Sequence, residues 1–135
     1  MRDISTTIQT IKEDMISNIP GLLQKSGLKD FDYYSIGYPT DQAKLYCAIR
    51  FANGNISDKN EFTFTIQIQL PGIVEELAYK YIDVISNYLT VFNQQSFGYI
   101  FKTYAIEVLE NFKAGDFQAF FDVTMSTPFD DCEEN

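Results

Sequence analysis

The segment from Glu61 to Phe92 constrains the fold of this chain more than any other part of it. Residues 62 to 69 read Phe-Thr-Phe-Thr-Ile-Gln-Ile-Gln, so apolar and polar side chains alternate strictly. This two-residue period is typical of a strand with one face buried and one face in water, as in an open antiparallel sheet. Pro71 and Gly72 then interrupt the strand, and a long amphipathic helix follows. The segment therefore predicts an α+β architecture.

Two helices are predicted from apolar residues at helical spacing. The first is expected from about residue 3 to 19, with Asp3 as its cap, a break or kink at Pro20-Gly21, and one further turn ending at Gly27. The second is expected to cover the sheet. The first stripe contains Ile4, Ile8, Ile11, Met15 and Ile19, and the second contains Val74, Leu77, Ala78, Tyr81, Ile85, Tyr88, Leu89 and Phe92.

Further strands are predicted on either side of the second helix. Residues 44 to 51 alternate and should form an antiparallel hairpin with the Glu61 strand, across a long tip. Residues 30 to 39 read as a loop that contains a short strand, and residues 117 to 127 alternate again. Residues 98 to 106 read as a strand, but residues 104 to 112 also fit helical spacing, so the end of this element stays open.

These elements predict a single α+β domain over residues 1 to 128. It has two layers, a mainly antiparallel sheet of four to five strands and two covering helices. A length of 135 residues and an apolar content of 45% are ordinary for one globular domain. Residues 129 to 135 form an acidic tail that is expected to be disordered.

Charge is distributed unevenly along the chain. Residues 1 to 60 hold seven basic and seven acidic residues, whereas residues 61 to 135 hold three and twelve, which accounts for the net charge of −9. Nucleic-acid binders need clustered Lys and Arg, so sequence-specific binding of nucleic acid is not expected. The longest apolar run, from Leu45 to Ile49, is far shorter than the roughly 20 residues of a membrane helix. We expect a soluble protein that is neither secreted nor membrane-bound.

The sequence offers little catalytic chemistry. It contains no histidine and no glycine-rich phosphate loop, which excludes histidine-based nucleophilic systems and the common nucleotide-binding motifs. Cys47 is expected to be buried and inert, and Cys132 to be free in the tail. We therefore expect no enzyme activity, no cofactor and no metal site. The remaining carboxylate pairs have no specific spacing, and they are Asp30 with Asp32, Glu75 with Glu76, and Asp130 with Asp131.

Four aromatic residues form the candidate protein interface. Phe31, Tyr33, Tyr34 and Tyr38 lie close together in the predicted loop. Tyrosine is enriched in protein contact surfaces, because it offers a rigid ring and a hydroxyl group. Packing into the core is the alternative interpretation of the same residues.

The order of elements and the passage from the residue 62 to 69 strand, through Pro71-Gly72, into Val74-Glu75-Glu76-Leu77-Ala78 resemble tail terminator proteins of long-tailed bacteriophages. These are also called tail completion or head-to-tail joining proteins. The resemblance implies a small subunit that forms a ring, commonly a hexamer, which caps the tail tube and joins it to the head connector. It implies location in the virion and the host cytoplasm. The family has no catalytic motif, so no residue is carried over as a site.

Two other classes fit the acidity and the missing catalytic groups. One is a secretion chaperone of the type III kind, a dimer that holds an extended effector segment. The other is an immunity protein that neutralises a toxin. The chaperone class usually ends in a further helix, whereas this chain ends in Pro128 and acidic residues.

Overall fold

The structure is a computed structural model that describes residues 4–37, 44–55, 61–92, 100–111 and 116–126. In the described chain, each of the two helices is followed by a run of strands, three after the first helix and two after the second. The elements are α1 (Ile4–Lys25), β1 (Tyr33–Ile36), β2 (Tyr46–Asn55), β3 (Glu61–Pro71), α2 (Glu75–Phe92), β4 (Ile100–Asn111) and β5 (Asp116–Ser126).

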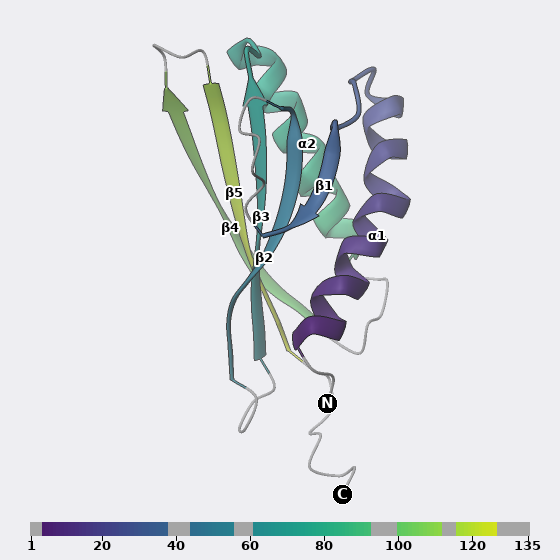
Figure 1. Ribbon diagram of the computed structural model, residues 1–135, viewed down its shortest axis with the longest axis vertical. Coiled ribbons are helices and arrows are strands. Elements are labelled where there is room, and N and C mark those ends of the chain that lie inside the picture. Colours follow the sequence, from purple (N-terminus) through teal and green to yellow (C-terminus); the bar gives the residue numbers. More distant parts are fainter. Residues whose placement is uncertain (1–3, 38–43, 56–60, 93–99, 112–115, 127–135) are drawn as a thin grey trace, which may run out of the picture.

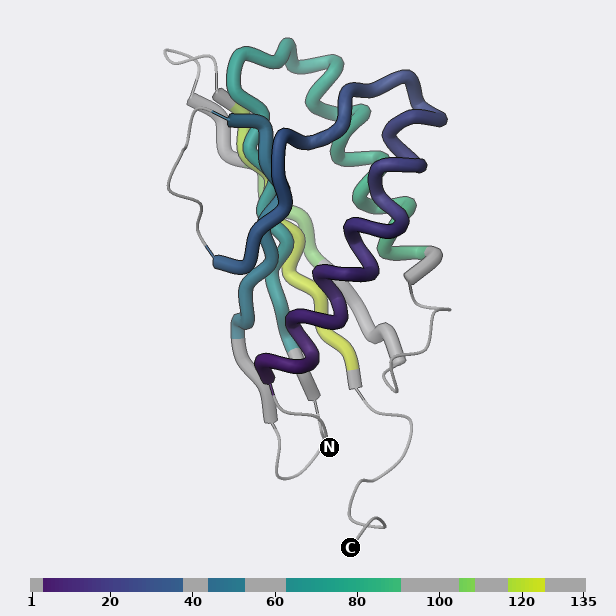
Figure 2. The backbone as a smooth tube through the Cα atoms, turned by 45° about the vertical axis from the view of Figure 1, so that its right-hand side comes forward, coloured from purple at the N-terminus to yellow at the C-terminus, as the bar shows by residue number. Residues whose placement is uncertain are grey.

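The strands form one sheet in the order β1-β2-β3-β5-β4 (Figure 1). β1 runs parallel to β2, and the other neighbouring pairs are antiparallel. Both helices lie against the same face of the sheet (Figure 2). The predicted α+β architecture of a mainly antiparallel sheet and two helices is therefore confirmed, and so is the antiparallel pairing of β2 with β3.

The core lies between the helices and the strands at the middle of the sheet. On the helix-side face, the apolar residues of β2, β3 and β5 pair in register and are buried, whereas Phe51, further along β2 on the same face, is exposed. α1 packs over β1 and β2, and α2 packs beside α1. The buried strand residues on this face include Cys47, Ile49, Phe64, Ile66, Ile68, Leu70, Ala119, Phe121 and Val123.

α1 continues through Pro20, where the sequence predicted a break or a kink, so the helix is not broken there. Proline inside a helix costs about 3 kcal/mol through the lost hydrogen bond and the clash with the preceding turn. Ile19 and Leu23, on either side of Pro20, are completely buried, and burial of each such side chain contributes about 1.5–3 kcal/mol. This packing offsets the cost. The end is as predicted, because Gly27 adopts φ +73° just past the helix and Leu28 N–H donates to the carbonyl of Leu23 at 2.9 Å.

α2 has the predicted buried face at Ala78, Tyr81, Ile85, Tyr88 and Leu89, with Leu77 partly buried, and two corrections apply. Val74 lies before the helix and is 68% exposed, so it does not belong to that face. Val84 was not predicted as part of the face, yet it is buried. Glu75 and Glu76 do occupy the first turn, where the helix dipole favours negative charge.

The polar face of β3 was predicted to be wet, and this is wrong. Gln67 and Gln69 are each only 2% exposed, although they lie on the face opposite the helices. Hydrogen bonds between strands lower the cost of this burial, since a buried polar group that finds a partner loses little free energy. Gln67 Nε2 donates to the hydroxyl of Tyr46 on β2 at 2.9 Å, and Gln118 Nε2 on β5 donates to Gln69 Oε1.

β4 is a strand along its full length, including residues 104 to 111, which the sequence left open between strand and helix. β5 agrees with the predicted strand of residues 117 to 127 to within a residue at each end. Asp3, Tyr38, Cys132 and the acidic tail lie outside the described residues, as does the tip between β2 and β3. No helix of the described chain is long and apolar enough to span a membrane.

Candidate functional site

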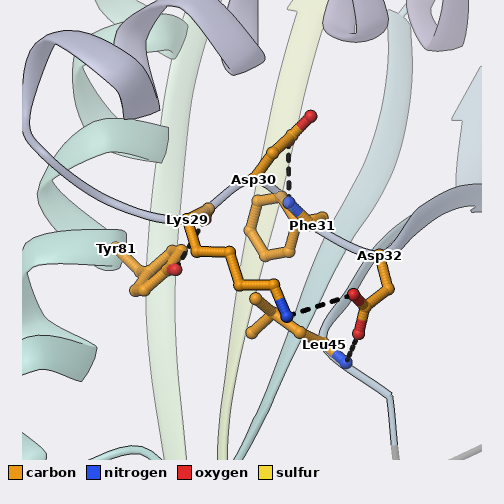
Figure 3. Close-up of polar contacts among 6 residues, drawn as sticks. All are labelled: Lys29, Asp30, Phe31, Asp32, Leu45 and Tyr81. Atoms are coloured by element: carbon orange, nitrogen blue, oxygen red, sulfur yellow. Dashed lines mark hydrogen bonds and ion pairs between the residues drawn. The ribbon is translucent and has the colours of Figure 1, made fainter.

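The carboxylates of Asp30 and Asp32 form hydrogen bonds that hold the connection between α1 and β1 in place (Figure 3). Asp30 Oδ1 accepts hydrogen bonds from the backbone N–H of Phe31 and from the hydroxyl of Tyr34, both at 2.7 Å. The two carboxylates point in different directions in Figure 3. They are therefore not arranged as a pair that would share one cation or one proton.

Asp32 ties this connection to the start of β2. Its Oδ2 accepts a hydrogen bond from the N–H of Leu45 at 3.0 Å, and its Oδ1 lies 3.4 Å from Lys29 Nζ. The Leu45 N–H and the nearby lysine lower the pKa of Asp32. The carboxylate thus stays ionised in a structural role, where it meets a backbone donor of the neighbouring segment.

A cleft of about 450 Å³ lies beside this connection. Polar and apolar atoms line it in similar proportion, and the ion pair of Lys29 with Asp32 lies on its wall. Tyr81 also lines it, but its hydroxyl is already used, since it donates to the carbonyl of Lys29 at 2.6 Å. The side-chain polar groups of Lys29, Asp32 and Tyr81 are therefore already paired within the subunit. Its lining residues are Gly27, Leu28, Lys29, Asp32, Leu45, Pro71, Ile73, Leu77 and Tyr81.

The aromatic residues of the predicted interface have different surroundings. Phe31 is 5% exposed and packs against the rings of Tyr34 and Tyr81, with both centroids 5.6 Å away. Its side chain therefore belongs to the core, which was the alternative interpretation. Tyr33 is partly exposed and stacks on Tyr46 on the face opposite the helices. Tyr34 is half-buried, and burial together with the bond to Asp30 raises its pKa.

Interface use of Tyr33 and Tyr34 stays a prediction. Tyr38 lies outside the described residues. Cys47 is buried, as expected, and burial raises the pKa of its thiol, which keeps the group protonated and unreactive. Within the described chain, no group of His, Cys, Asp and Glu side chains is placed to hold a metal ion.

The free edge of β4 is the surface that sequence reasoning missed. β4 is the last strand of the sheet, and among the described strands none lies beyond it. Ile106 pairs with Phe121 and Val108 pairs with Ala119, so both lie on the face that carries the helices. Their partners on β5 are completely buried, yet Ile106 and Val108 are 42% and 36% exposed. We call Ile106 and Val108 the β4 edge patch.

The helices explain this exposure. β4 packs against β5, and the two helices pack mainly on β1, β2, β5 and each other. In Figure 1, β4 lies at the side of the sheet farthest from α1. The described helices leave these two apolar side chains open, and no described strand pairs with the outer backbone groups of β4. This edge can therefore act as a template for pairing with another chain.

The sequence carries little signal for this surface. Residues 104 to 112 fitted either a strand or a helix, so Ile106 and Val108 were not assigned to one face of a strand. The sequence also does not say which strand ends the sheet, because strand order depends on contacts between distant segments. No family model matches the chain, and no curated protein matches its sequence.

Proposed function

We propose that this protein is a non-enzymatic assembly subunit that works as a homo-oligomer, in the manner of the phage tail terminators that its sequence pattern resembles. In that role the subunits form a ring that caps a tail tube and joins it to a head connector. The ring stops growth of the tube, because it presents a face that tube subunits cannot extend. Such a subunit acts through the surface that it presents to its partners, and it catalyses no reaction.

The β4 edge patch is the observation that supports this proposal. Soluble proteins usually protect long edge strands with charges, bulges or covering elements. β4 has twelve residues, and two of its apolar side chains lie open on the helix-side face. Such an edge gains most from a partner that continues the sheet and covers these side chains.

Native mass spectrometry and negative-stain microscopy test the proposal on the whole chain. We expect a defined oligomer that appears as rings, alone or with the accompanying tail-tube protein. Ile106→Lys places a charge in the β4 edge patch and should shift the protein to monomer. Val74→Lys is the matched control, since Val74 is exposed but lies before α2, so this variant should assemble like the parent.

A strict monomer, even with tail-tube protein added, would contradict the proposal. A stable dimer that captures an unfolded peptide would identify a chaperone instead. Tight one-to-one binding to a basic nuclease would identify an immunity protein. Equal assembly of the parent and of Ile106→Lys would mean that the subunits meet through another surface.

A further inference from the structure

We infer that the subunits meet head to tail, with the β4 edge patch of one copy against the β1 edge of the next copy. This inference rests on the proposed homo-oligomer and specifies its interface. β1 and β4 end the sheet on opposite sides, so the contact joins two different surfaces. A contact of this heterologous kind generates a ring when its rotation closes.

The strand directions allow this contact. β1 runs parallel to β2, and each later step across the sheet, from β2 to β3, β5 and β4, is antiparallel. β1 and β4 therefore run in opposite directions. When β4 of one copy meets β1 of the next in the same orientation of the sheet, the new pair is antiparallel, and the helix-side faces of both copies stay on one side.

The β1 edge carries an apolar residue on the same face as the β4 edge patch. Ile36 pairs with Ile49, which is completely buried on the helix side, yet Ile36 is 48% exposed. Its place at the outer edge of the sheet explains the difference, since no described strand lies beyond β1. Each end of the sheet thus presents unburied aliphatic side chains to its surroundings on the helix-side face.

α1 packs over β1 and β2, so α1 of the next copy would lie beside the β4 edge, over which no described helix packs. Asp14 accepts a hydrogen bond from the hydroxyl of Tyr88 at 2.6 Å, so this side of α1 faces α2. Met15, one residue on, is completely buried. At 100° per residue, Ile16 then lies on the flank opposite Asp14, which faces away from α2 and toward the β1 edge. We call Ile16 and Ile36 the β1 edge patch, and both are exposed.

Charge favours this arrangement over a symmetric one. The described segments 4–37 and 44–55, which form α1, β1 and β2, hold five basic and four acidic residues. The described segments 100–111 and 116–126, which form β4 and β5, hold one basic and four acidic residues. Pairing two β4 edges would bring two acidic regions together, whereas head-to-tail contact places the acidic region against a balanced one.

Side-chain alternation limits the register. Residues that face each other across an antiparallel pair point to the same side of the sheet. Setting Ile36 opposite Ile106 of the next copy also sets Tyr34 opposite Val108, so both helix-side pairs are apolar or aromatic. On the other face, the same register sets Ser35 opposite Glu107.

Disulfide cross-linking tests this register in the full-length chain with Cys132→Ser as the parent. Ile36→Cys combined with Ile106→Cys should link copies into dimers, trimers and higher multiples under mild oxidation. Within one copy the two positions lie four strand spacings apart, about 19 Å, so a disulfide inside one chain is impossible. Ser35→Cys combined with Glu107→Cys is a second pair that tests the same register from the opposite face.

Ile36→Cys combined with Glu107→Cys is the matched control. It moves one thiol by a single residue, which turns it to the other face, and we expect at least tenfold less linked product. The single variant Ile106→Cys should give little disulfide-linked dimer. A dimer as strong as that of the double variant would overturn the inference in favour of symmetric β4 pairing.

Native mass spectra of the parent separate the two failures. If the parent is an oligomer and neither pair links more than the control, the head-to-tail contact is wrong while the proposed function stands. If the parent is a monomer under all conditions, the proposed function fails and this inference fails with it. The substituted side chains lie at the sheet edges, so we expect every variant to fold. Circular dichroism of each variant checks this.

Discussion

β3 and β4 each place an isoleucine beside the same residue of β5, and the two isoleucines have opposite environments. Ile66 of β3 and Ile106 of β4 both pair with Phe121 of β5, one from each side and on the same face of the sheet. Ile66 is completely buried, whereas Ile106 is 42% exposed. The helices that cover the middle of the sheet do not extend over β4. Whether such a side chain is buried within the subunit or left exposed depends on the position of its strand in the sheet, and not on the local sequence pattern.

The sharpest way to break this comparison is to truncate both isoleucines. Ile66→Ala leaves a cavity in a closed core and should lower the free energy of unfolding by about 3–4 kcal/mol. Ile106→Ala should cost less than about 1 kcal/mol, because this side chain is largely in water in the isolated subunit. Urea unfolding of dilute, dissociated protein measures both. Losses of similar size would show that β4 is as well covered as β3.

The polar face of β3 gives the second prediction. Tyr46→Phe removes the acceptor for Gln67 Nε2 and leaves a buried donor unpaired, which should cost about 1–3 kcal/mol. Adding Gln67→Leu removes that donor and also Gln67 Oε1, which has no hydrogen-bond partner among the described residues. The double variant should therefore regain part of the loss in urea unfolding.

Glu107→Gln is the control for that pair of variants. Glu107 lies on the same face of the sheet as Gln67, but it is exposed at the edge. Its replacement should change stability by less than about 0.5 kcal/mol. If the double variant is less stable than Tyr46→Phe alone, the buried amide contributes packing that the hydrogen bonds do not explain.

The third prediction concerns the helical cover that β3 has and β4 lacks. Burial and the hydrogen bond to Asp14 raise the pKa of Tyr88, so the folded state holds this proton more tightly than the unfolded state does. An unfolded tyrosine ionises at about pH 10. The stabilisation is therefore complete below that pH and falls as the pH rises toward the folded pKa.

Tyr88→Phe should lower stability by about 0.5–1.5 kcal/mol at pH 7 and should weaken the further loss between pH 9 and 11. Urea titrations across this range measure the slope. Parallel slopes for the parent and the variant would mean that the contact between α1 and α2 does not depend on this proton. The effect would then belong to other buried groups, such as the Cys47 thiol, whose pKa is also raised.

Much of the fold could be predicted because its signals are local. Two-residue alternation located β2, β3 and β5, and helical spacing located the buried faces of α1 and α2. The errors have a common cause in contacts between distant segments. The helix continues through Pro20 because Ile19 and Leu23 pack into the core, and the burial of Gln67 is made less costly by the hydrogen bond that its amide donates to Tyr46 on another strand.

The candidate site was harder to predict than the fold. The loop aromatics drew attention as clustered tyrosines, but Phe31 packs into the core, and sequence cannot distinguish the two uses of an aromatic ring. The β4 edge patch could not be found, since Ile106 and Val108 lie in the segment that fitted either a strand or a helix. Their exposure follows from the strand order, in which β5 lies between β3 and β4.

Hydrogen exchange of backbone amides, measured by mass spectrometry at several protein concentrations, tests the central claim most directly. In the dilute monomer, we expect peptides from β4 to exchange faster than peptides from β3. As the oligomer forms, the β4 peptides should gain protection, while the exchange of the β3 peptides should stay unchanged. Assembly without any gain of protection in β4 would contradict the claim that another copy of the chain completes this edge.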